Sequence, residues 1–179
     1  MHLRRKHIAL TYGCIAGICM ILFMSILYKA GVKYYLGPVA YLGYAILIGL
    51  ATAAALTEKK AGDGYLEFRA ALKTCFTVFV IGLAAQTLYI WVLVNILDPR
   101  FKAEVTQAIF QNQEDFLRRG GMSEDQLGPY MASERSKDQF TMGGMITGLA
   151  ITYIVHFLIA LVISAIVKKK KPVFSDAGI

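Results

Sequence analysis

The sequence predicts an all-α integral membrane protein, a four-helix bundle with one long connection between its third and fourth spans. Four stretches contain no Asp, Glu, Lys or Arg, namely His7–Tyr28, Tyr34–Thr57, Thr74–Leu97 and Gln139–Val167. Each has at least 22 residues, and about 20 apolar residues are enough to cross the hydrocarbon core of a bilayer. The chain is also 56% hydrophobic, with a mean hydropathy of +0.52. Such a composition is more apolar than that of soluble domains.

The 179 residues leave room for one membrane domain, 1–179, and for no second folded domain. We expect its spans at about 8–28, 36–56, 74–97 and 142–167. The first span is too long for the core of a cleavable signal peptide, and Lys29 and Lys33 follow it directly, so we expect it to be retained.

Basic residues flank the spans and predict their orientation. With four spans, three basic clusters fall on one side: Arg4–Lys6, the connection Lys59–Lys73, and Lys168, Lys169, Lys170 and Lys171. The positive-inside rule makes this side cytoplasmic, with both termini. We expect the four lysines of the tail 168–179 to contact anionic lipid headgroups. The net charge of +7 therefore indicates a lipid bilayer and not nucleic acid as the partner.

The long connection, 99–138, is predicted to be an extracytoplasmic helical hairpin. Asp98-Pro99 is a typical helix start, because Asp caps the first amides and Pro fits the first turn. We expect this helix to reach about Arg119 and to stop at Gly120-Gly121. Ser123–Gln126 matches a capping box that opens a second short helix. The hairpin is either a lid on the ends of the spans or a docking surface for a partner.

Small residues recur every four positions in three spans, a spacing that lets helix backbones approach closely. The fourth span carries Gly144, Gly148, Thr152, His156, Ala160 and Ser164. Related ridges run through the first and second spans. We expect the following glycines to be helix-packing positions: Gly13, Gly17, Gly49, Gly144 and Gly148.

Two polar side chains are predicted near the middle of the membrane, Gln86 in the third span and His156 in the fourth. An unpaired amide or imidazole is costly there, so both should face inward and find a partner. We expect hydrogen bonds between the two or to Thr87, Thr152 or Tyr153. This polar cluster is either interhelical glue or a binding spot.

The spans lack the chemistry of several functional classes. No charged residue lies inside a span, which disfavours ion- and proton-coupled transport. No catalytic constellation, phosphate loop or metal-ligand cluster is visible, so we expect no enzymatic activity and no cofactor. Cys14, Cys19 and Cys75 form no C-x-x-C pair and are expected to be small packing residues.

Several short motifs resemble one family. They are Tyr12-Gly13 with Gly17, the run Gly64–Lys73 (GYLEFRAALK), Asp98-Pro99, and Gly121–Gln126 (GMSEDQ). With the length and the four-span layout, the chain resembles the bacterial membrane family catalogued as domain of unknown function 4199. The resemblance implies an inner-membrane protein of about this topology. It implies no activity and no catalytic residues.

Two functions remain open from the sequence. The first is a non-enzymatic membrane subunit or scaffold that packs against a membrane-protein partner or forms a homo-oligomer. The alternative is a binder or carrier of a lipid or small molecule, with a cleft under the hairpin near Tyr44, Gln86, Tyr89 and His156. An enzyme acting on a lipid is a third and weaker interpretation.

Overall fold

A computed structural model describes residues 2–170 of the chain, with side chains from His7 onward. Its elements are α1 (His2–Ala30), α2 (Val32–Tyr35), the 3₁₀ turn η1 (Pro38–Tyr41), α3 (Leu42–Ala61), α4 (Phe68–Val92), the π-helical turn η2 (Leu93–Leu97), α5 (Pro99–Arg119), α6 (Glu124–Arg135) and α7 (Met142–Val167). The predicted all-α fold is confirmed. Within the described part, β pairing is limited to one antiparallel bridge between Leu66 and Lys169.

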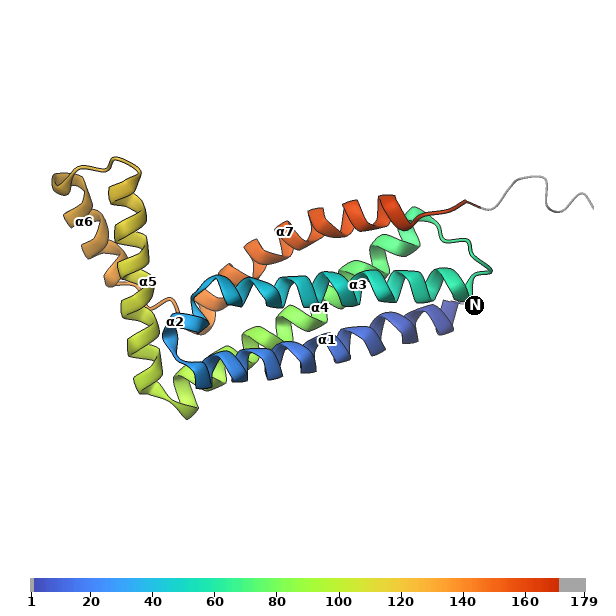
Figure 1. Ribbon diagram of the computed structural model, residues 1–179, viewed down its shortest axis with the longest axis horizontal. Coiled ribbons are helices and arrows are strands. Elements are labelled where there is room, and N and C mark those ends of the chain that lie inside the picture. The colour runs from blue at the N-terminus through green and yellow to red at the C-terminus, as the bar shows by residue number, and fades with distance from the viewer. Residues whose placement is uncertain (1, 171–179) are drawn as a thin grey trace, which may run out of the picture.

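Four helical segments are long and apolar enough to cross a membrane: His7–Ala30, Pro38–Ala61, Phe68–Leu97 and Met142–Val167. Each overlaps one of the charge-free stretches. Figure 1 shows the four lying side by side, with α5 and α6 crossing one end of the bundle. We call this the hairpin end. The start of α1 and the end of α7 lie at the opposite end. We call it the basic end, because Lys59, Lys60 and Lys168–Lys170 lie there.

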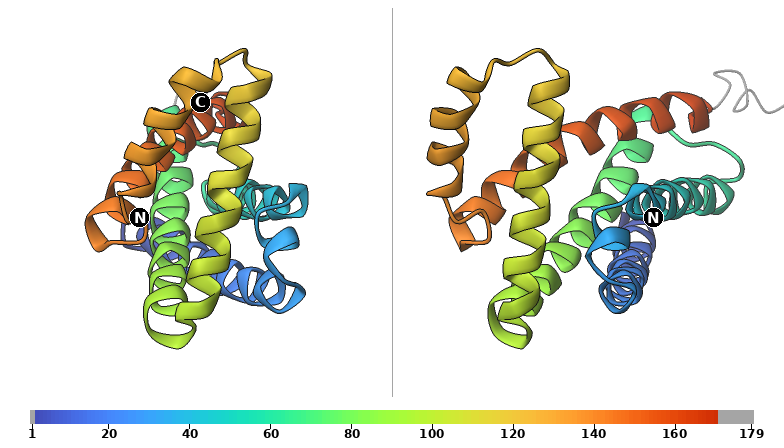
Figure 2. Two further views of the ribbon diagram at one scale, coloured as in Figure 1. Left: turned by 90° about the vertical axis from the view of Figure 1, so that its left-hand side faces the viewer. Right: turned by 60° about the vertical axis from the view of Figure 1, so that its left-hand side comes forward.

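α4 is the central helix of the bundle, because it contacts α1, α3 and α7, whereas α7 packs chiefly on α4. At the hairpin end, α7 and α3 lie on opposite sides of α4 (Figure 2, left). The bundle is therefore less closed between α3 and α7 at this end.

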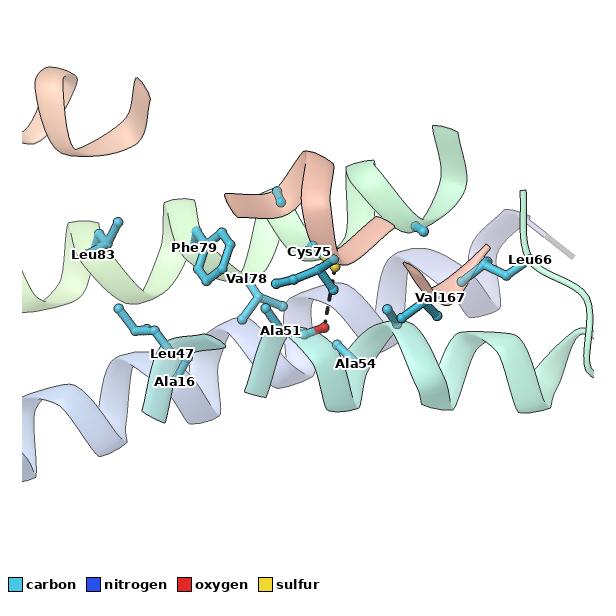
Figure 3. Close-up of a cluster of buried hydrophobic side chains, with 14 of the residues drawn as sticks. Ala16, Leu47, Ala51, Ala54, Leu66, Cys75, Val78, Phe79, Leu83 and Val167 are labelled. Atoms are coloured by element: carbon cyan, nitrogen blue, oxygen red, sulfur yellow. Dashed lines mark hydrogen bonds between the residues drawn. The ribbon is translucent and has the colours of Figure 1, made fainter. Parts of the chain in front are cut away.

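The best-packed core lies toward the basic end and joins all four long helices (Figure 3). Leu47 and Ala51 of α3 meet Val78 and Phe79 of α4 there, and all four are fully buried. The Cys75 thiol donates a hydrogen bond to the carbonyl of Ala51, at 3.5 Å. Close packing of this kind stabilises helices in a bilayer, where burial of apolar surface from water contributes little between spans.

The glycines predicted to pack helices differ in their surroundings. A Cβ added to Gly13 would lie 2.7 Å from Ile81, and one added to Gly17 would lie 2.9 Å from Ala85. Both glycines therefore let α1 approach α4 too closely for any side chain.

Gly49 and Gly148 have room instead, since no described atom lies within 4 Å of an added Cβ at either position. At Gly144 the added atom would meet Gln139 and Thr141, which precede it in the chain. Gly144-x-x-x-Gly148 thus lies at no helix–helix contact of the described chain.

The hairpin is joined to the bundle through Asp98. Its Oδ1 accepts the amides of Arg100 and Phe101, at 3.1 and 3.0 Å, and its Oδ2 accepts the Tyr28 hydroxyl at 2.8 Å. The rings of Tyr28 and Tyr35 meet Phe101 edge to face, with centroids 4.8 and 5.1 Å away. The predicted helix start at Asp98-Pro99 and end at Arg119 are confirmed.

The second helix of the hairpin begins after Ser123, as predicted, but the prediction of a capping box there is wrong. Ser123 has the extended backbone of an N-cap residue, yet its side chain makes no capping hydrogen bond. The amides of Gln126 and Leu127 bond the Ser123 carbonyl instead.

The basic end holds a buried carboxylate, that of Glu58, which lies just outside the charge-free stretch Tyr34–Thr57. The second span was expected to end near residue 56, but α3 continues to Ala61, and the Glu58 side chain is 1% exposed. The Thr74 hydroxyl donates a hydrogen bond to it. α3 therefore extends past the expected end of the second span, and its first charged side chain is buried in the bundle.

The start of the tail folds back on the loop between α3 and α4. Leu66 and Lys169 exchange two backbone hydrogen bonds of 2.9 Å. The Lys168 and Lys169 ammonium groups lie over the Phe68 and Tyr65 rings. Lys171 and residues 172–179, part of the predicted lipid-contacting tail, lie outside the described residues.

Candidate functional site

A cleft of about 590 Å³ opens at the hairpin end, where α7 and α3 diverge. We call it the α7 cleft. Its floor is α4, its main wall is the first half of α7, and its roof is Ile109 of α5 with the segment 137–140. The lining residues are Tyr44, Leu83, Gln86, Thr87, Ile90, Ile109, Lys137, Asp138, Gln139, Phe140, Gly144, Met145, Thr147, Gly148, Leu149 and Thr152.

A second cleft of about 250 Å³ lies on the α1 side of α3 and α4, and we call it the α1 cleft. It is lined by Met20, Met24, Tyr35, Leu36, Gly37, Ala40, Tyr41, Tyr44 and Gln86. None of these lining residues is charged. Tyr44 and Gln86 line both clefts, so they form the partition between them.

Polar groups without partners gather around this partition. Gln86 makes no hydrogen bond with any described residue, although an amide offers two donors and an acceptor. Among the described residues, two buried side-chain polar atoms lack a partner, Tyr35 Oη and His156 Nε2. Tyr35 lines the α1 cleft, and the His156 ring lies 5.4 Å from that of Tyr44.

His156 is fixed by its own helix and by two aromatic rings. It is 3% exposed, and its Nδ1 donates to the Thr152 carbonyl at 2.9 Å. The carbonyl can only accept, so Nδ1 carries the hydrogen, and Nε2 is the ring nitrogen without a partner. The ring of Phe79 lies 5.1 Å away, so the imidazole is held between α3 and α4.

The predicted polar cluster is partly assembled. Gln86, Thr87 and Thr152 line the α7 cleft together. Of the expected hydrogen bonds, His156 makes one to Thr152, at its backbone carbonyl, whereas Gln86 and His156 are not hydrogen-bonded to each other within the described residues. Tyr153 lies elsewhere, with its hydroxyl donating to the Val80 carbonyl at 3.0 Å.

The tyrosines expected near a cleft divide between two roles. Tyr44 and Tyr41 line the α1 cleft, and their ring centroids are 6.3 Å apart. Tyr89 lines neither cleft. It accepts a 2.7 Å hydrogen bond from Ser25 of α1 and so joins α1 to α4.

Hydrogen bonds that the sequence analysis did not predict hold the roof of the α7 cleft in place. Asn95 donates to the Phe140 carbonyl at 3.1 Å, and the Lys102 ammonium donates to Asn95 at 3.1 Å and to Asp138 at 2.7 Å. The Lys102 hydrogen bond holds the pKa of Asp138 below its usual range. Asn95 was a usable signal, since it is a polar residue within the third charge-free stretch.

The clefts offer hydrogen bonds and apolar contacts. No group of three or more His, Cys, Asp or Glu among the described residues could hold a metal ion. The apolar walls and the few convergent polar groups are typical of a small-molecule site.

Comparison with known proteins gives a family and no assigned activity. No curated protein and no solved structure matches the chain. One family model matches residues 11–169, all but the first ten and last ten residues, and it is described as a protein of unknown function, DUF4199. A match over this much of the sequence shows that the chain belongs to the DUF4199 family.

Proposed function

We propose that this membrane protein binds an amphipathic molecule, a lipid or a lipid-like compound, in the α7 cleft. One observation carries the proposal: the floor of the α7 cleft presents the Gln86 amide beside aliphatic side chains, and this amide has no partner among the described residues. Such a surface suits a ligand with an apolar body and a polar group.

The free-energy cost of an amide without a hydrogen bond favours a bound ligand in this cleft. An amide removed from water without a hydrogen bond costs roughly 2–7 kcal/mol. A polar group held beside Gln86 and Thr87 offsets this cost, while Leu83, Ile90 and Leu149 contact the apolar part. The cleft volume of about 590 Å³ lies in the range of roughly 300–1,000 Å³ that is common for ligand sites.

The lining chemistry favours binding over catalysis. It combines aliphatic side chains, hydroxyls and the amides of Gln86 and Gln139, and its charged residues lie at the roof, where Asp138 is paired with Lys102. No nucleophile is paired with a base along the cleft wall. We infer a carrier or sensor of its ligand and not an enzyme.

Native mass spectrometry of the purified chain in mild detergent tests this proposal. We expect one adduct of defined mass at about one copy per chain, which is released by harsher detergent and restored when the extracted molecule is added back. A bare chain, or an unselective ladder of bulk lipids, would contradict it.

A second candidate function rests on the first half of α7. Gly144 and Gly148 are exposed and meet no other helix, and Ile146 and Ile151 beside them are also exposed. Small residues at this spacing support close helix pairing, so a membrane subunit that pairs through this face, with a partner or a second copy, is the alternative. A mass of one chain without a protein partner in the same spectrum would exclude it.

We also infer a bacterial inner membrane and an orientation with both termini in the cytoplasm. Support comes from the lysines gathered at the basic end, among them Lys59, Lys60 and Lys168–Lys170, and from the positive-inside rule. The hairpin then lies outside the cytoplasm. Lys168–Lys170 are well placed at the end of α7 to contact anionic headgroups.

A further inference from the structure

We propose that the ligand is an uncharged lipid with a hydroxyl group, and that this group enters the α1 cleft between Tyr35 and Gln86 while the apolar chain lies in the α7 cleft. This inference rests on the proposed function and names the class of ligand. Four observations lead to it.

The first observation is the neutrality of the α1 cleft. Its lining consists of apolar side chains, three tyrosines and Gln86, with no charged residue. A phosphate or an ionised carboxylate would find no counter-charge there, and an unpaired charge in such surroundings is strongly unfavourable. The polar end of the ligand is therefore uncharged.

The second observation is the border that the two clefts share. Tyr44 and Gln86 border both of them, so a molecule that lies across this partition reaches both spaces. The α1 cleft of about 250 Å³ suits a small polar group, and the α7 cleft of about 590 Å³ suits a chain.

The third observation is the hydroxyl of Tyr35. This side chain is 94% buried and lines the α1 cleft, and its Oη has no partner among the described residues. Its ring is held edge to face on Phe101, 5.1 Å away, so the hydroxyl is kept in place. A phenol both donates and accepts hydrogen bonds.

The fourth observation is the set of hydrogen-bond donors and acceptors in the cleft that have no partner among the described residues. Tyr35 presents one donor and an acceptor, and Gln86 presents two donors and an acceptor, and neither side chain has a partner among the described residues. A ligand group that donates a hydrogen bond satisfies the acceptor of either side chain. A hydroxyl group donates and accepts, whereas an ether or an ester only accepts, so the hydroxyl is the best match.

Three probes with the same chain separate these properties: oleyl alcohol, oleyl methyl ether and oleate. Each is titrated into the full-length protein in neutral-lipid nanodiscs at pH 8, and occupancy is read by native mass spectrometry. We expect oleyl alcohol to bind about tenfold more tightly than its methyl ether, as one lost hydrogen bond at an enclosed site implies. Ionised oleate should bind more weakly than the alcohol.

Two phenylalanine variants place the hydroxyl group. Tyr35→Phe should weaken oleyl alcohol severalfold and leave the methyl ether unchanged. Tyr34→Phe is the matched control. The Tyr34 side chain is next to Tyr35 in the chain, but it is 48% exposed and lines neither cleft. This variant should bind both probes as the wild type does. A thermal midpoint of Tyr35→Phe no lower than that of the wild type shows that the variant is folded.

The outcomes separate the inference from the function on which it rests. If no probe binds the wild-type chain, the proposed function fails, and the inference fails with it. If alcohol and ether bind alike, if oleate matches the alcohol, or if Tyr35→Phe changes nothing, the function stands and the hydroxyl assignment is overturned. Diolein and geranylgeraniol in the same assay distinguish an acylglycerol from an isoprenoid alcohol, and selective binding of either one supports the assignment.

Discussion

Asp98 shows how one side chain joins two parts of this molecule. It caps α5 through the amides of Arg100 and Phe101, and it accepts the Tyr28 hydroxyl from α1. These bonds favour the charged carboxylate, so the hydrogen bonds from the Phe101 amide and the Tyr28 hydroxyl hold its pKa below the ordinary value of 3.8.

The lowered pKa predicts acid loosening of the hairpin. A carboxyl group with a depressed pKa contributes stability above its unfolded pKa and loses it as the pH falls through the folded value. We expect the amides at the start of α5 to lose hydrogen-exchange protection only below about pH 4. Asp98→Asn should have lower protection at neutral pH and no further loss over this range. A wild-type profile as flat as that of the variant would refute this role.

Single residues also mark where sequence reasoning succeeded and where it stopped. Gln86 was identified because a polar side chain in a long apolar stretch is conspicuous, and the structure places it in the wall of both clefts. Tyr35 gave no such signal, since an interfacial tyrosine is ordinary and its burial depends on the packing of α2 against α5. The burial of Glu58 was not predicted, because each span was drawn from a stretch without charged residues. Such a criterion leaves out any charged side chain that the bundle buries.

At the scale of helices, glycines that recur with the same spacing have different roles. Gly13 and Gly17 bring α1 against α4, whereas Gly49 and Gly148 face open space in the described chain. Spacing alone could not separate them, because it predicts that a helix can be approached and not which helix approaches it.

This difference predicts the effects of a matched pair of substitutions. Gly17→Leu forces a side chain against Ala85, 2.9 Å from the new Cβ, and should lower stability by about 1–3 kcal/mol, the usual range for overpacking. Gly49 is exposed, and a Cβ added there has no described atom within 4 Å, so Gly49→Leu should be neutral or slightly stabilising, since Leu favours helix over Gly. Thermal unfolding in detergent measures both, and equal midpoints would count against the α1–α4 contact.

Helix boundaries were predictable where local chemistry decides them. Asp98-Pro99 and Gly120-Gly121 delimit α5 as expected, because capping and glycine geometry are properties of a few consecutive residues. The π-helical turn Leu93–Leu97 and the 3₁₀ turn Pro38–Tyr41 were not anticipated. They lie at the ends of two candidate spans, Pro38–Ala61 and Phe68–Leu97.

At the scale of the whole molecule, the hairpin lies at one end of the bundle, and the start of α1 and the end of α7 lie at the other (Figure 1). The proposed orientation predicts opposite labelling of two exposed positions. In a chain with Cys14, Cys19 and Cys75 replaced, Asp63→Cys should react with a membrane-impermeant maleimide only after the cells are opened, and Ser123→Cys should react in intact cells. The reverse pattern would invert the topology.

The divergence of α7 from α3 is the structural basis of the proposed binding site. Gly148 lines the α7 cleft and leaves room for a larger side chain, whereas Gly143 lies earlier on the same helix, is exposed and lines no part of this cleft. The two positions therefore offer an insertion into the cleft and a matched insertion outside it.

Ligand occupancy in Gly148→Phe and Gly143→Phe is the most direct test of the account. We predict that Gly148→Phe fills the cleft and abolishes the defined adduct in the native mass spectrum, with the thermal midpoint of the ligand-free chain unchanged. Gly143→Phe should keep the adduct at the wild-type level. Retention of the adduct in Gly148→Phe, or its equal loss from both variants, would contradict binding in the α7 cleft.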